Sequence, residues 1–127
     1  PDEILEPPLK RHARVLLALD GSALDREMLA RLPRCCVKLS PRLDILLVNP
    51  PREPTSCLAM LLLRLEHGGI DYHLASSHGE MGAEILRYLA RQRGITAVVL
   101  AGATSLDAES RKLIELKGQR VVLLGEC

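Results

Sequence analysis

The sequence predicts an α/β domain in which helices cover both faces of a five-stranded parallel sheet. Two observations carry this prediction. Five short apolar runs alternate along the chain with segments of helical periodicity, and most of these runs are apolar on both faces, as strands buried in parallel sheets are. In addition, hydrophobic residues make up 47% and charged residues 26% of the 127 residues, which is typical of one globular domain.

We expect residues 1–13 to be a tail or linker and residues 14–127 to form the domain. The opening segment is polar and contains Pro7 and Pro8, which favour an extended chain. It has no apolar stretch of the kind that a secretory signal needs.

The first strand is expected over Arg14–Asp20, an apolar run that ends in a turn. Ser22 stands where a helix N-cap is needed, and Asp25 follows three residues later, as in a capping box. Apolar side chains then recur with a spacing of four on one helical face, at Leu24, Met28 and Leu32. Pro33 should kink or break this helix because it has no N–H to donate.

A second apolar run, Leu43–Val48, predicts the second strand, which Pro50 and Pro51 end. The helix expected next, Ser56–His67, is apolar nearly all round, and Gly68 ends it. A helix that borders water is rarely so apolar. We therefore expect it to be mostly buried in the assembly, under the N-terminal segment or against another subunit or domain, with contacts at Leu58, Leu61 and Leu62.

The third strand, Ile70–Ala75, alternates polar and apolar residues through Asp71 and His73, which indicates a half-exposed edge strand. A third helix is expected over Gly82–Arg93. A fourth strand apolar on both faces follows at Thr96–Ala101, then a helix capped by Ser105 and ended by Gly118, then a fifth strand at Arg120–Leu124.

Right-handed crossovers and a polar third strand favour the order 3-2-1-4-5, a doubly wound three-layer sandwich of the nucleotide-binding α-hydrolase-like type. In this order the direction of winding reverses between the first and fourth strands. Ligands of such sheets bind at the carboxyl ends of the strands at that point. The candidate crevice therefore lies at Asp20-Gly21-Ser22 and at the turn from Gly102 to Ser105.

The sequence motifs of several known kinds of functional site are absent from this chain. No GxGxxG follows a strand, and there is no GxxxxGK[ST] or GxSxG motif, so the usual dinucleotide, P-loop and hydrolase-elbow sites are absent. No metal site is expected, because no CxxC pair occurs and the spacings of His67, His73 and His78 fit no zinc template. The cysteines read as reduced thiols of a cytoplasmic protein: Cys35, Cys36, Cys57 and Cys127.

Charge and composition also exclude two kinds of partner. The formal net charge is +1 and the only aromatic residues are Tyr72 and Tyr88, so the chain offers nucleic acid neither a basic face nor a stacking platform. The apolar run Leu58–Leu63 is far too short for direct insertion into a membrane.

Three stretches resemble the universal stress protein family. They are VLLALDGS at Val15–Ser22, GAEILRYLA at Gly82–Ala90 and GITAVVLAG at Gly94–Gly102. The likeness runs in element order over roughly residues 14–125. It implies a stress-response role and a homodimer paired through the last strand, at Val121, Val122, Leu123 and Leu124.

The ATP-binding branch of that family has Gly-x-x-Gly, nine residues, and then Gly followed by Ser or Thr after the fourth strand. Glycines there let backbone N–H groups approach the phosphates. Here Gly102 matches the first glycine, but Ser105 replaces the second and Glu115-Leu116 stand at the Gly-Ser pair. The resemblance implies that Asp20 meets the nucleoside end and that Val48 lines it. The residual crevice thus comprises Asp20, Gly21, Ser22, Val48, Gly102 and Ser105, and no tight ATP binding is expected.

These observations leave three functional hypotheses open. The leading one is a non-catalytic, dimerising and regulatory domain of the universal stress protein type, alone or within a longer chain such as the cytosolic tail of a transporter. It has no cofactor and a degenerate nucleotide crevice. The second is an adenine nucleotide sensor that binds AMP or ATP through Asp20 and Val48. The third is a small nucleotide-type hydrolase or transferase, which lacks an acid, base and nucleophile set at the switch point.

Overall fold

The computed structural model describes residues 14–21, 24, 27, 29, 42–53, 56–100 and 106–123. The first predicted helix and its break at Pro33 lie largely outside these residues, as does the N-terminal segment before residue 14. The elements in chain order are β1 (Arg14–Asp20), β2 (Arg42–Val48), α2 (Ser56–His67), β3 (Asp71–Ser77), α3 (Met81–Arg91), β4 (Ile95–Leu100), α4 (Ala108–Leu116) and β5 (Arg120–Leu123).

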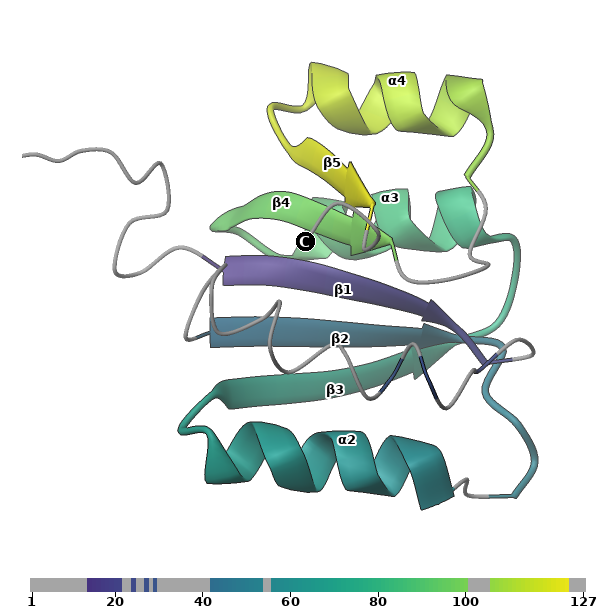
Figure 1. Cartoon of the computed structure of the whole chain (residues 1–127). Coiled ribbons are helices and arrows are strands. Elements are labelled where there is room, and N and C mark those ends of the chain that lie inside the picture. The colour runs from purple at the N-terminus through teal and green to yellow at the C-terminus, as the bar shows by residue number, and fades with distance from the viewer. Residues whose placement is uncertain are drawn as a thin grey trace, which may run out of the picture.

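The five strands form one parallel sheet in the order β3-β2-β1-β4-β5, which confirms the predicted topology (Figure 1). β1 is central and pairs with β2 on one side and β4 on the other, so that Leu17 lies between Ile45 and Val99. β3 and β5 are the two edges. The alternation of polar residues correctly marked β3 as an edge strand.

Two apolar clusters hold the helices to the two faces of the sheet. On one face, Leu17 and Ile45 pack with Leu61 and Leu65 of α2. On the other face, the alternate strand residues pack with Ile85 and Tyr88 of α3 and Ile114 of α4; they include Leu16, Ala18, Leu46, Val48 and Val98. The alternation follows from the two-residue period of a strand. Full burial of one such leucine contributes about 1.5–3 kcal/mol.

The two helices on the second face begin where acidic side chains cap them. α3 begins at Met81, where the Glu80 carboxylate accepts hydrogen bonds from the backbone of the first turn. α4 begins at Ala108, and its N-cap is Asp107, so the prediction that Ser105 caps this helix was wrong. Ser105 itself lies outside the described residues. Asp caps as well as Ser does, and Asp107 directly precedes the first helical residue.

The apolar helix α2 buries one side against its own sheet. Leu61 is only 1% exposed, and Leu58 and Leu62 pack half-buried against the same cluster. The three residues expected to meet a partner therefore already contact the sheet of their own chain. The apolar side chains that face outward are Met60 and Leu63, which are 48% and 45% exposed. A partner over this helix stays a prediction, and it would contact Met60 and Leu63 first.

None of the described helices is long and apolar enough to cross a membrane. Figure 1 shows α2 beside β3 and α4 beside β5, at the two opposite edges of the sheet.

Candidate functional site

The carboxyl ends of β1 and β2 bring together three of the predicted site residues. Asp20 and Val48 are register partners, and the Gly21 N–H donates to the Val48 carbonyl at 2.7 Å. Asp20 is half-buried, whereas Val48 is 1% exposed and packs in the cluster beneath α3. Ser22, Gly102 and Ser105 lie outside the described residues.

Gly21 has a packing role at this edge. A Cβ added at Gly21 would lie 2.3 Å from the carbonyl oxygen of Asn49, so only glycine allows the turn after β1 to approach the turn after β2 so closely. The sequence marked Gly21 as a binding residue. The structure shows that its lack of a side chain is needed for the turns after β1 and β2 to pack against each other.

Asn49 ties β2 to the loop that follows β3. Its backbone N–H donates to the Ser77 carbonyl at 2.7 Å, and its φ is 55°, a left-handed conformation that Asn tolerates. Its side-chain amide then pairs with the Gly79 backbone, donating to the carbonyl at 2.9 Å and accepting from the N–H at 3.0 Å. These neutral bonds fix the carboxyl ends of β2 and β3 to each other.

At the carboxyl end of the sheet, the N-termini of α3 and α4 are capped by carboxylates of the chain itself. Glu80 accepts from the N–H groups of Gly82 at 3.1 Å and Ala83 at 2.9 Å. Asp107 accepts from the Ser110 N–H at 3.2 Å, and its hydrogen bonds with Ser110 lower the pKa of Asp107. A helix N-terminus attracts anions. In α3 and α4 that position is occupied by the protein's own side chains.

A second polar site, which the sequence analysis missed, lies at the opposite, amino end of the sheet. Asp44 is 3% exposed although it sits within the apolar strand β2. Arg14 Nε donates to Asp44 Oδ1 at 2.9 Å, Arg14 Nη2 donates to Asp44 Oδ2, and the Tyr88 hydroxyl donates to Oδ2 as well. Arg14 also donates to the Gln92 side chain and to the Arg93 carbonyl, each at 3.0 Å. One carboxylate thus joins β1, β2 and the end of α3.

Burial and charge set the acid–base properties of this group. Burial, followed by the hydrogen bond and the charge of Asp44, raises the pKa of Tyr88 to about 12. The hydrogen bond to Asp44 raises the pKa of Arg14 above its usual value. The phenol therefore stays protonated at neutral pH and can donate to the carboxylate, while the guanidinium supplies the compensating charge that a buried carboxylate needs.

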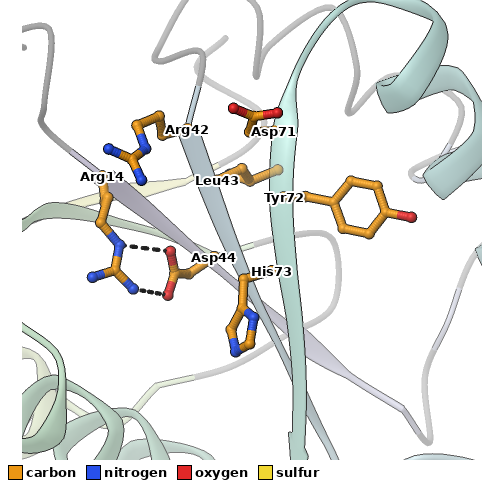
Figure 2. A pocket seen from close by; sticks show the side chains of 7 residues that line it. All are labelled: Arg14, Arg42, Leu43, Asp44, Asp71, Tyr72 and His73. Carbon is orange, nitrogen blue, oxygen red and sulfur yellow. Dashed lines mark hydrogen bonds and ion pairs between the residues drawn. The ribbon is translucent and has the colours of Figure 1, made fainter.

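Beside this group the surface is hollowed by a cavity of about 160 Å³ (Figure 2). Its lining comes from the amino ends of β1, β2 and β3: Arg14, Arg42, Leu43, Asp44, Asp71, Tyr72 and His73. Within the described part of the chain no group of three or more His, Cys, Asp or Glu side chains could hold a metal ion.

No family model matches the chain, and no curated protein gives a significant match. Among solved structures, the shikimate dehydrogenase of Mycobacterium tuberculosis is similar over 87% of this chain, with a TM-score of 0.46 and 11% sequence identity. The match covers 44% of that enzyme's chain, so this chain spans less than half of its length. A likeness this distant adds nothing on function, and the fold rests on the strand order described above. The resemblance to the universal stress proteins stays a hypothesis.

Proposed function

We propose that the chain is a non-catalytic regulatory domain of the universal stress protein type, which acts as a homodimer and whose nucleotide crevice no longer holds phosphates. The observation that carries this proposal is the Asp107 carboxylate at the N-terminus of α4. A nucleotide phosphate bound there would lie against a carboxylate that already accepts the local N–H group. The negative charges of the phosphate and of Asp107 would repel each other. The Ser110 N–H, which could otherwise bind the phosphate, already donates to Asp107.

The dimer part of the proposal is supported by the position of β5. Within the described chain this strand pairs only with β4, so one side of Arg120–Leu123 presents unpaired backbone groups. A two-fold axis beside it would pair the strand antiparallel with its own copy and close the interface. Of the residues expected in this contact, Val121 is half-buried in the cluster beneath α3 and α4, and Leu124 lies outside the described residues.

A nucleotide series tests the crevice. Thermal melts with millimolar ATP and Mg²⁺ should leave the melting temperature unchanged, and the same should hold for ADP. A ligand at one hundred times its dissociation constant stabilises by about 2.7 kcal/mol, which raises the melting temperature of a domain this size by several degrees. Such a rise with ATP would contradict the proposal.

The second candidate, an adenosine or AMP sensor, is favoured by the place of Asp20 at the carboxyl end of the central strand β1. It predicts that adenosine or AMP raises the melting temperature of the wild type but not that of the Asp20→Asn variant. If the wild type melts at the same temperature with and without adenosine, this candidate fails.

Two proline variants test the interface. Along a parallel strand, alternate N–H groups point to opposite neighbours, so Val122→Pro and Leu123→Pro each remove a donor on a different side. One variant should become a monomer in size exclusion with light scattering, whereas the other should lose stability by breaking the pairing with β4. A wild type that is monomeric at high micromolar concentration would contradict the dimer.

A further inference from the structure

The hollow at the amino end of the sheet lies on the face that α3 covers. Asp44 and His73 are register partners on β2 and β3, and Arg42 and Asp71 are the pair two residues earlier. Residues two apart in a strand point to the same face, so all four side chains lie on one face of the sheet. Leu43 and Tyr72, between them in sequence, belong to the core on the opposite face. Two neighbouring strands thus present a polar patch at the rim of an otherwise apolar face.

One wall of this hollow is fixed in place. Asp44 is 3% exposed and its carboxylate accepts from Arg14 and Tyr88, while Arg14 is in turn held by Gln92 and the Arg93 carbonyl. A small molecule that binds at the exposed Arg42 and Asp71 would therefore lie against a wall whose side chains are already ordered, so that only the side chains of Arg42 and Asp71 have to be ordered on binding.

The charges around the hollow are divided by sign. Figure 2 shows the cations Arg14 and Arg42 on one side and the carboxylate of Asp71 on the other, with Asp44 between them and the imidazole of His73 on the same strand as Asp71. The side chains of Asp71 and His73 make no hydrogen bond or ion pair within the described part of the chain. Arg42 already has an interaction, but a guanidinium carries five N–H donors and can serve more than one acceptor.

This division selects among ligand classes. A simple anion would be attracted by the two arginines but repelled by Asp44 and Asp71. A simple cation would be attracted by the two aspartates but repelled by the arginines. Two arginines and two aspartates cancel, so the hollow has no net attraction for either. A molecule with both charges a few bonds apart can satisfy both sides at once, and 160 Å³ is the room of about five water molecules.

We propose that this hollow binds a small zwitterion of the free α-amino acid class, with its carboxylate towards Arg42 and its ammonium group towards Asp71. The site lies at the end of the sheet opposite to the nucleotide crevice, and it does not depend on the function proposed above. The size of the hollow favours glycine, alanine and serine over amino acids with long side chains.

The proposal can be tested by titrating ¹⁵N-labelled protein with glycine, alanine and serine while following the backbone amide signals. The signals of residues 42–44 and 71–73 should move and saturate at millimolar concentrations. Acetate and methylammonium each carry one half of the zwitterion, and at equal concentrations they should leave these signals in place. Arg42→Gln and Asp71→Asn should each weaken binding about tenfold or more, the loss expected for one charge-assisted hydrogen bond.

Matched variants on α4 serve as controls. Lys112→Gln and Glu109→Gln remove one charge of each sign from exposed positions and should leave the affinity unchanged. Amide signals from the rest of the chain report that each variant is folded. The proposal is wrong if none of the three amino acids gives a saturable change at these residues, if acetate or methylammonium gives the same change, or if Arg42→Gln and Asp71→Asn bind as the wild type does.

Discussion

The two ends of the parallel sheet are closed by different chemistry. At the carboxyl end, a glycine contact and a neutral amide connect the turns that follow β1, β2 and β3, through Gly21 and Asn49. At the amino end, the buried Asp44 carboxylate is held by Arg14 and Tyr88. The first arrangement depends on shape and is insensitive to pH. The second depends on every partner of a buried charge being present, so the two ends should fail under different changes.

The largest effect is expected when Arg14 is removed from the amino end. Arg14→Met leaves the Asp44 carboxylate buried without its counter-charge, which typically destabilises by about 3–5 kcal/mol. Adding Asp44→Asn removes the charge but keeps an acceptor for the Tyr88 hydroxyl, so the double variant should recover much of the loss. Urea denaturation measures both. A single variant within 1 kcal/mol of the wild type would show that the ion pair contributes little.

The amino end should also weaken in alkali. A free tyrosine has a pKa near 10, whereas that of Tyr88 is raised to about 12 by burial and by Asp44. The folded protein therefore holds this proton more tightly than the unfolded chain does. The resulting stabilisation, about 3 kcal/mol, is complete below pH 10 and is lost as the pH rises towards 12.

Tyr88→Phe isolates this contribution, since it removes the phenol and leaves the ring. Unfolding free energies measured between pH 9 and 12 should fall more steeply for the wild type than for the variant. Parallel curves for the two proteins would mean that the Tyr88 proton is not linked to folding.

The carboxyl end should respond to volume. Gly21→Ala places a methyl group 2.3 Å from the Asn49 carbonyl oxygen and forces the two turns apart, at a cost of about 1–3 kcal/mol. Gly68→Ala is the matched control, because the nearest atom to its added Cβ is 3.4 Å away. Thermal melts of the two variants should separate clearly. Equal melting temperatures would refute the close contact at Gly21.

The smallest effect is expected at Asn49. Asn49→Gly keeps the left-handed backbone but removes the amide pair with Gly79, which should cost about 1 kcal/mol because the bonds are exposed. Asn49→Ala loses the same bonds and also strains the backbone, so it should cost about 1 kcal/mol more. Chemical denaturation distinguishes the two, and an alanine variant as stable as the glycine variant would exclude backbone strain at this position.

The same contrast explains what the sequence could predict. β1 was expected over Arg14–Asp20 and is found there, and the strand order followed from apolar runs and crossover rules, because both depend on local pattern. Topology placed Asp20 at the carboxyl end of the sheet and the resemblance to the universal stress proteins added Val48; the strand register makes the two residues neighbours.

The amino-end site could not be predicted in the same way. Asp44 is 30 residues from Arg14 and 44 from Tyr88, so the contact depends on strand register and on how α3 packs. The one available signal was a charged residue inside an apolar run. The cap of α4 was missed for a different reason, since Ser105 and Asp107 are both good capping residues, and the position of the first helical turn decides between them.

The central place of β1 has a consequence for synthesis on the ribosome. Of the five strands in this sheet β1 is made first, yet one of its neighbours is β4. Arg14 pairs with Ile95, so that side of β1 stays unpaired until β4 has been made. Until β4 has left the exit tunnel, the central strand of the sheet exposes a complete row of unpaired backbone groups on that side. A nascent chain stalled before β4 would therefore be prone to aggregate and would be a natural client for chaperones.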